Sequence, residues 1–216
     1  MHPVVGVVIA YLLGSIPFAW LAGRARGIDL RHHGSGNLGA TNAVRVLGVP
    51  TGAGVYLLDT LKGFIPVFVL APMLITNRQD LWAIAMGIAA IVGHVRPVYL
   101  GFQKGGKGVA TAGGVFLALA PLATAVGLGI WVLVFLPSGY VSLASIVTAA
   151  LFPVSVFLTG TPARSALFAV SVVMALFVVW THRPNIGRLR RGEEHRFRRS
   201  KATVSEPRIV SPENRS

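Results

Sequence analysis

The sequence contains no cysteine. This absence excludes disulfide bonds, thiolate metal sites and a cysteine nucleophile. Acidic residues are also scarce, because 7 Asp and Glu stand against 20 Lys and Arg. The polar loops carry no paired carboxylates that could hold Mg²⁺, so we expect neither a metal nor another cofactor. Arg and Lys would then have to neutralise any bound phosphate.

Charged residues of both signs make up only 12% of the chain, whereas a soluble domain carries about a quarter. Hydrophobic residues reach 53%, and the mean hydropathy is +0.66. Apolar runs near the roughly 18 to 20 residues needed to cross a bilayer recur along the chain. The composition therefore predicts an all-α integral membrane protein, a polytopic bundle of packed helices.

Four stretches of the chain set the number of crossings. Single spans are predicted at Pro3–Ala22, Thr51–Ile75 and Leu81–Leu100. The stretch Gly108–Thr181 holds four short helices better than two, which gives seven spans in total, with five as the alternative. Breaks are expected near Pro121, Pro137 to Gly139 and Thr159 to Arg164.

Basic residues indicate the orientation. Ten of the twenty Lys and Arg lie between Arg183 and Ser216. The positive-inside rule places the two glycine-rich loops, Gly34–Asn42 and Phe102–Thr111, and the C-terminus in the cytoplasm. The N-terminus then lies outside. Arginine beside anionic lipid explains this charge better than nucleic-acid binding, so we expect membrane lipid and no nucleic acid as a partner. Residues 1–192 are predicted to form the transmembrane domain and 193–216 a polar, disordered tail.

The first polar loop, Gly34–Asn42, formally matches the dinucleotide pattern GxGxxG. It follows a membrane span instead of a strand, so a Rossmann turn is excluded. Glycines still allow backbone N–H groups to surround an anion, and Arg45 adds a bidentate partner for phosphate. The alternative is an ordinary flexible loop. The candidate phosphate-binding residues of this loop are Ser35, Gly36, Asn37, Thr41, Asn42 and Arg45.

The second polar loop, Phe102–Thr111, approaches a Walker A sequence. Gly108 stands where Ser or Thr would hold Mg²⁺, so nucleotide hydrolysis is not expected. Lysines beside paired glycines at a helix start still suit a phosphate. The alternative is that both lysines only anchor the loop in the cytoplasm. The candidate residues here are Lys104, Gly105, Gly106 and Lys107.

Ionisable residues inside the spans are costly and are functional candidates. Asp59 and Lys62 lie three residues apart on one helix face, where they can neutralise each other; a purely structural ion pair is the alternative. His94 lies near the second loop. Where the last span ends, a further polar cluster contains His182, Arg183, Asn185, Arg188 and Glu193.

Five motifs occur together in order: Gly14-Ser-Ile-Pro, GSGNLGATN with Arg45, Asp59-Thr-Leu-Lys-Gly, GGKGVAT, and His182-Arg-Pro-Asn-Ile. From about Gly14 to Glu193 the chain resembles the bacterial acyl-phosphate:glycerol-3-phosphate acyltransferases, the PlsY family. Gln103 is a small departure, since Lys is expected after Phe102.

The resemblance implies an enzyme of the inner membrane that transfers a fatty acyl group from acyl phosphate to the 1-hydroxyl of glycerol 3-phosphate. The products would be 1-acyl-glycerol 3-phosphate and phosphate, at an early step of phospholipid synthesis. The phosphate-binding residues of both loops would serve the two substrates. His182, Asn185 and Ser35 are the catalytic candidates, and a monomer is plausible.

Two questions stay open at the level of sequence, the route of the proton and a transport function, and two other enzyme classes do not fit. No histidine is followed by Asp at the HxxxxD spacing, which excludes the soluble and peripheral glycerolipid acyltransferases. The proton of the attacking hydroxyl could go to the substrate phosphate or to His182. A membrane transporter of an organic phosphate is the alternative function. A CDP-alcohol phosphotransferase fits poorly because the aspartates are isolated.

Overall fold

A computed structural model of the chain describes residues 2–74 and 79–197, and every regular element in these ranges is helical. The N-terminal half contains α1 (Pro3–Gly14), α2 (Phe18–Arg24), α3 (Ala40–Leu47), α4 (Val49–Ile65), α5 (Ala71–Leu74) and α6 (Gln79–Val95). The C-terminal half contains α7 (Val109–Leu119), α8 (Pro121–Ser138), α9 (Val141–Leu158), α10 (Ala166–Thr181) and α11 (Arg183–Arg190). Short 3₁₀ turns at Leu30–His32 and Val98–Leu100 and a π-helical turn at Pro66–Leu70 complete the set.

The all-α membrane architecture predicted from composition is confirmed, but the count of seven spans is not. Five helical segments are long and apolar enough to cross a membrane: Pro3–Arg24, Val49–Leu74, Asp80–Leu100, Pro121–Ser138 and Val141–Leu158. A sixth is added if α10 and α11, which meet at 53°, form one broken span. The remaining apolar helix, α7, has only 11 residues.

Four helices, α7 to α10, do occupy Gly108–Thr181, and their ends fall at the expected breaks. Proline and glycine mark these ends for local reasons. Pro121 is an early residue of α8, where its missing N–H costs nothing, and Gly139 ends α8 with φ +70°. The breaks were therefore predictable from single residues.

Helices α4 and α7 pack closely because glycines face backbone atoms across the contact. A Cβ on Gly63 would overlap the carbonyl oxygen of Thr111, and a Cβ on Gly114 would overlap that of Thr60. Small residues of this kind let helices approach in a bilayer, where burial of apolar surface gives little driving force. The crossing fixes the start of α7, and hence the loop before it, against α4.

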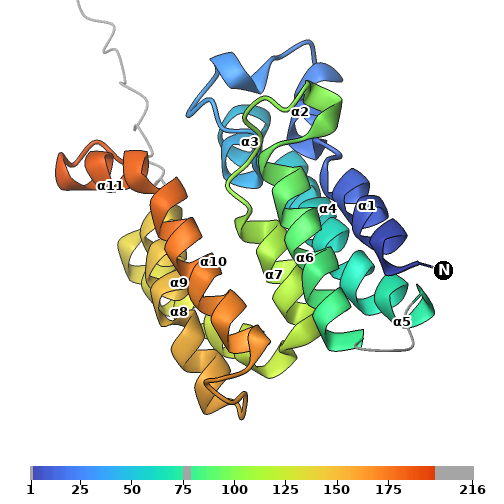
Figure 1. The fold of residues 1–216 in the computed structure, drawn as a ribbon. Coiled ribbons are helices and arrows are strands. Elements are labelled where there is room, and N and C mark those ends of the chain that lie inside the picture. The colour runs from blue at the N-terminus through green and yellow to red at the C-terminus, as the bar shows by residue number, and fades with distance from the viewer. Residues whose placement is uncertain (1, 75–78, 198–216) are drawn as a thin grey trace, which may run out of the picture.

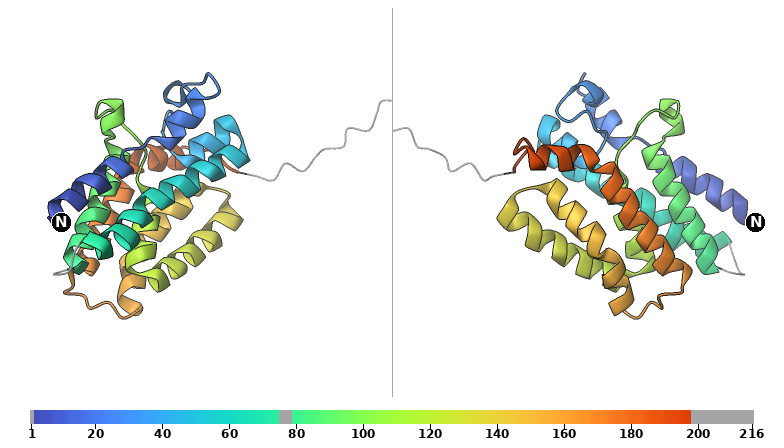
Figure 2. Two further views of the ribbon diagram at one scale, coloured as in Figure 1. Left: turned by 90° about the vertical axis from the view of Figure 1, so that its right-hand side faces the viewer. Right: turned by 60° about the vertical axis from the view of Figure 1, so that its left-hand side comes forward.

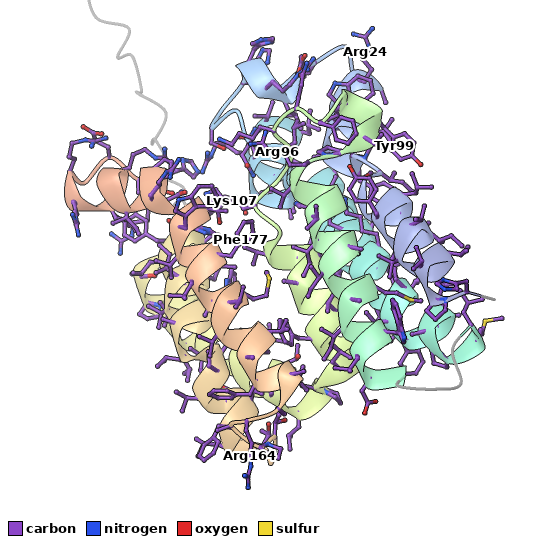
Figure 3. The ribbon with its side chains drawn as sticks, viewed as in Figure 1. Arg24, Arg96, Tyr99, Lys107, Arg164 and Phe177 are labelled. Carbon is purple, nitrogen blue, oxygen red and sulfur yellow. The ribbon has the colours of Figure 1, made fainter. Side chains whose placement is uncertain are left out.

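The polar loops gather at one end of the helix bundle. Figure 1 shows α3, the connection from α6 to α7, and α11 toward this end, and the two views of Figure 2 agree. Arg164, between α9 and α10, lies at the opposite end from Lys107 (Figure 3). Three segments far apart in the sequence thus meet at one end of the bundle.

Candidate functional site

Asn42 holds the first loop in shape. The side chain is 1% exposed, and its Nδ2 donates to the carbonyls of Leu30 (3.3 Å) and His33 (3.0 Å). Its Oδ1 accepts from the backbone N–H of Ser35 at 2.8 Å. Both Nδ2 protons are used in these bonds, so the expectation that Asn42 donates to an anion does not fit this arrangement. Asn42 instead shapes the loop that carries the other candidates.

The first loop has fewer free backbone N–H groups than expected for an anion site. Ser35 N–H donates to Asn42, and Gly36 N–H donates to the carbonyl of His33 at 3.1 Å. Gly36 adopts φ +68° close to the carbonyl of Arg31, a conformation and a fit that suit glycine. The Ser35 residue is exposed, which leaves its hydroxyl facing solvent. The loop therefore offers the Ser35 hydroxyl instead of the N–H groups of Ser35 and Gly36.

Beyond the loop, α3 brings further polar groups to the site. No side chain caps the N-terminus of α3, so its first N–H groups, near Thr41, remain available to an anion. Arg45 is half-buried on the same helix. Its Nε and the Oδ1 of Asn37 are both buried and have no hydrogen-bond partner in residues 2–74 and 79–197. Unpaired buried polar atoms are rare, so these two favour the binding of a polar ligand here.

The second loop is fixed to the end of α6 by its backbone. Gly105 N–H donates to the carbonyl of Val95 at 2.9 Å, and Gly106 N–H donates to that of His94 at 3.2 Å. The N–H groups of these two candidate glycines are therefore already used in hydrogen bonds within the protein. A Cβ on Gly105 would overlap the His94 carbonyl oxygen, so close packing requires glycine there. Free N–H groups lie instead at the start of α7, which no side chain caps.

Lys107 connects the second loop to the last helices. Its Nζ donates a hydrogen bond to Oδ1 of Asn185, which is buried near the start of α11. Asn185 Nδ2 donates in turn to Oε1 of Glu194 at 2.7 Å, and Arg188 Nε donates to the other carboxylate oxygen at 2.7 Å. The amide of Asn185 thus joins a cation of one loop to a carboxylate after α11.

Glu194 is a site residue that sequence reasoning missed. The polar cluster predicted at the end of the last span included Glu193, which is exposed and pairs with Arg191 at 2.8 Å. Glu194 instead is 9% exposed and also accepts from Ser142 Oγ at 2.9 Å. Burial alone would raise the pKa of Glu194, but its hydrogen bonds hold that pKa below the usual value, so the carboxylate is ionised. No motif in the sequence distinguishes it from its neighbour.

Glu194 also bears on the domain boundary expected after residue 192. Residues 193–197 belong to the folded part: Phe197 N–H donates to the Gly139 carbonyl at 2.8 Å, and Arg196 Nε donates to that of Ser138 at 2.8 Å. The other residues of the expected tail, 198–216, lie outside the described ranges. The folded segment thus closes over the turn between α8 and α9.

The environment of Lys107 is strongly cationic. Burial lowers the pKa of Lys107 to about 8, and the neighbouring Arg188, Lys104 and Arg45 act in the same direction, against the attraction of Glu194. Cations therefore outnumber carboxylates around this lysine. Such an excess favours an anionic ligand, whose charge would stabilise the ammonium form.

His182 lies between α10 and α11 and is 4% exposed. Its Nδ1 is 2.8 Å from the Val178 carbonyl oxygen, and because a carbonyl can only accept, Nδ1 carries the proton. The neutral ring therefore has an unprotonated Nε2. Lys107 and Glu194 lie near enough to act on His182 electrostatically. The arrangement would let Nε2 accept a proton or a hydrogen bond.

The structure thus brings together most of the predicted residues. One region is surrounded by six side chains, which together we call the cation cluster. They are Arg45, Lys104, Lys107, His182, Asn185 and Arg188. Asp59 and Lys62 form the predicted ion pair, at 2.8 Å, but inside the bundle. The described residues contain no group of three or more His, Asp or Glu that could hold a metal ion. The cluster could bind phosphate through Arg and Lys.

Comparison with known proteins agrees with this geometry. Residues 4–192 match the family model described as glycerol-3-phosphate acyltransferase. A glycerol-3-phosphate acyltransferase of Geobacter metallireducens is 54% identical over 190 residues, which cover 88% of this chain and 94% of the relative. One of Geotalea daltonii is 46% identical over 91% of this chain and 98% of the relative.

Two solved structures are also similar. A crystal structure of PlsY, an integral membrane glycerol 3-phosphate acyltransferase, in its glycerol 3-phosphate form has a TM-score of 0.84 and 40% identity, over 92% of this chain and 96% of that one. The lysophosphatidic acid form has a TM-score of 0.81 and 39% identity over the same shares. The chain therefore belongs to the glycerol-3-phosphate acyltransferase family of integral membrane proteins.

Proposed function

We propose that the protein transfers a fatty acyl group from acyl phosphate to the 1-hydroxyl of glycerol 3-phosphate. The products are 1-acyl-glycerol 3-phosphate, a lysophosphatidic acid, and inorganic phosphate. The observation that carries the proposal is the cation cluster, which joins two loops and α11 and suits substrates that both carry phosphate. The glycerol 3-phosphate and lysophosphatidic acid forms of the related PlsY structure support the same acceptor and product.

The reaction needs little beyond positioning and charge neutralisation. The hydroxyl oxygen attacks the acyl carbonyl carbon, the bond from that carbon to the phosphate oxygen breaks, and phosphate leaves with the bonding electron pair. The hydroxyl proton passes to the departing phosphate or to Nε2 of His182. Acyl phosphate is already activated, so the first route requires no protein base.

The residues of the site have different roles. Arg45, Lys104 and Lys107 neutralise the phosphates, and Asn185 orients the Lys107 ammonium. The Ser35 hydroxyl, Asn37, Thr41 and the start of α7 donate further hydrogen bonds. Gly36, Gly105, Gly106 and Asn42 hold the two loops in shape. Ser35 acts as a hydrogen-bond donor, and no acyl-enzyme forms.

The substrates fix where the site must face. Glycerol 3-phosphate is water-soluble and acyl phosphate is a lipid, so the cation cluster lies at a membrane surface. The positive-inside rule makes this the cytoplasmic surface of the bacterial inner membrane, with the N-terminus outside. Residues 1–192 carry the acyltransferase domain together with the folded segment that includes Glu194. The acyl chain would enter between helices from the bilayer.

One assay tests the proposal. Purified protein in lipid nanodiscs is given palmitoyl phosphate and labelled glycerol 3-phosphate in excess EDTA. We expect labelled lysophosphatidic acid and phosphate, sequential kinetics, and no acyl ester on Ser35 after incubation with palmitoyl phosphate alone. Uptake of glycerol 3-phosphate into proteoliposomes without any acylated product would show a transporter instead.

A second measurement separates the two routes for the proton. If the substrate phosphate takes it, His182→Asn lowers kcat without removing the acidic limb of the pH–rate profile. If His182 is the base, that limb disappears. Comparison of the two profiles at saturating substrate decides between them.

A further inference from the structure

Three ionisable side chains form a buried cluster inside the helix bundle, apart from the cation cluster. Asp59 is 1% exposed, Lys62 is 5% exposed and His94 is 6% exposed. Lys62 Nζ lies 2.8 Å from Asp59 Oδ1, and His94 Nδ1 lies 3.5 Å from the same oxygen. Lys62 Nζ also donates to the Ile16 carbonyl at 2.7 Å, at the break before Pro17. These groups belong to α4, α6 and the connection from α1 to α2.

His94 links this cluster to the second loop. The edge of its ring that carries Nε2 packs against Gly106 so closely that a Cβ on Gly106 would overlap it. The His94 backbone carbonyl also accepts the Gly106 N–H at 3.2 Å. The imidazole is therefore held between Asp59 on one side and Gly106 on the other. The next residue after Gly106 is Lys107, whose ammonium contacts Asn185.

We propose that His94, oriented by the Asp59–Lys62 ion pair, is a positioning residue that sets the loop Gly105–Lys107 and so aims Lys107 at Asn185. The inference rests on the proposed role of Lys107 in phosphate binding. His94 itself touches no substrate. Lys62 balances the charge of Asp59, so that the carboxylate can stay ionised in the bundle and hold the ring.

The packing argues against an ion pair that serves stability alone. Burying charges is costly, and a buried pair is often no more stabilising than apolar residues of the same size. Here the carboxylate oxygen nearest to Lys62 is also the one nearest to His94, and it has no hydrogen bond of ideal geometry. A pair that only joined helices would not need the third member. The contact of His94 with Gly106 supplies a reason for it.

The test measures the position of Lys107 without relying on catalysis. The purified protein is modified with acetic anhydride at a series of pH values, and acetylation of Lys107 is read by mass spectrometry. For the wild type we expect a midpoint near the pKa of Lys107, about 8. In His94→Asn the loop loosens and Lys107 gains water, so the midpoint rises by about one pH unit. The kcat/KM of the acyl-transfer reaction falls roughly tenfold.

Two further variants complete the experiment. Asp59→Asn combined with Lys62→Met removes both charges together, leaves no unpaired ion, and is expected to raise the midpoint as His94→Asn does. Met86 lies on the same helix as His94, two turns before it, and is fully buried. Met86→Ala therefore serves as the control, because it leaves a cavity roughly 12 Å along the helix from His94. Its midpoint should equal that of the wild type even if thermal stability falls.

The outcomes are distinct. A raised midpoint in the two loop-linked variants, with an unchanged one in Met86→Ala, supports the inference. An unchanged midpoint in both linked variants, or an equal rise in Met86→Ala, overturns it. If the wild type shows no acyl transfer at all, the proposed function fails, whereas the Lys107 midpoints still decide whether His94 positions the loop.

Discussion

At the scale of single residues, Arg45 and Lys107 are the cations whose removal should lower activity most. Each is partly buried in the cation cluster, and a charge-assisted hydrogen bond to phosphate contributes about 1.5 to 3 kcal/mol. Replacing either by Ala should lower kcat/KM at least roughly tenfold. Arg190 is an exposed cation of α11, so Arg190→Ala is the matched control and should change kcat/KM little. Wild-type kinetics in both Arg45→Ala and Lys107→Ala would contradict the assigned roles.

The lowered pKa of Lys107 predicts an alkaline limit to activity. A lysine with a pKa of about 8 keeps its proton below that pH and loses it above, so its charge is fully present in acid and fades as the pH rises. We expect kcat/KM to fall as the pH passes 8, with bound phosphate moving the limit upward in kcat. Lys107→Arg, which stays charged, should abolish this limb. Persistence of the limb in that variant would assign it to another group.

At the scale of helices, the α4–α7 crossing predicts opposite results for two neighbouring glycines. Gly114→Ala places a methyl group against the Thr60 carbonyl and should destabilise the protein by about 1 to 3 kcal/mol. Gly113→Ala meets nothing within 4 Å and should be neutral or slightly stabilising. Thermal unfolding in detergent measures both, and equal effects would mean that the helices do not pack as described.

The elements also show where reasoning from sequence succeeds. Helix ends at Pro121, Gly139 and the turn after Leu158 were predictable, because each depends on local backbone preferences. The partners of individual N–H groups were not, since Gly105 and Gly106 bond to carbonyls of α6 that only the folded loop brings near. Lys107 and Arg45 were identified by their chemistry and Asn185 through the family resemblance, whereas their arrangement around a carboxylate was not predicted.

Glu194 shows a second limit of the sequence. It stands beside Glu193 in a strongly basic segment, and composition alone made the whole segment look disordered. Its burial depends on Ser142, Asn185 and Arg188, which lie on α9 and α11. Partners of this kind are set by tertiary packing. The count of seven spans is not confirmed by helix length and hydropathy, because α7 is short and α10 is continued by a bent helix.

At the scale of the whole molecule, the opposite positions of Lys107 and Arg164 predict the orientation (Figure 3). The chain has no cysteine, so single cysteines report accessibility without interference. Arg164→Cys should be labelled by an impermeant maleimide from the periplasm of intact cells. Arg190→Cys should be labelled only after the inner membrane is opened. The reverse pattern would invert the topology and place the cation cluster outside.

The joining of Lys107 to Asn185 and Glu194 has a consequence for biosynthesis. The ribosome delivers the two glycine-rich loops early, but Asn185, the partner of Lys107, comes 78 positions after it, and Glu194 follows later still. A nascent chain that has inserted only through α9 therefore holds Lys107 without its partner Asn185. Under the proposed function, activity should begin only when translation has passed Glu194, so partly made chains in the membrane would not consume acyl phosphate.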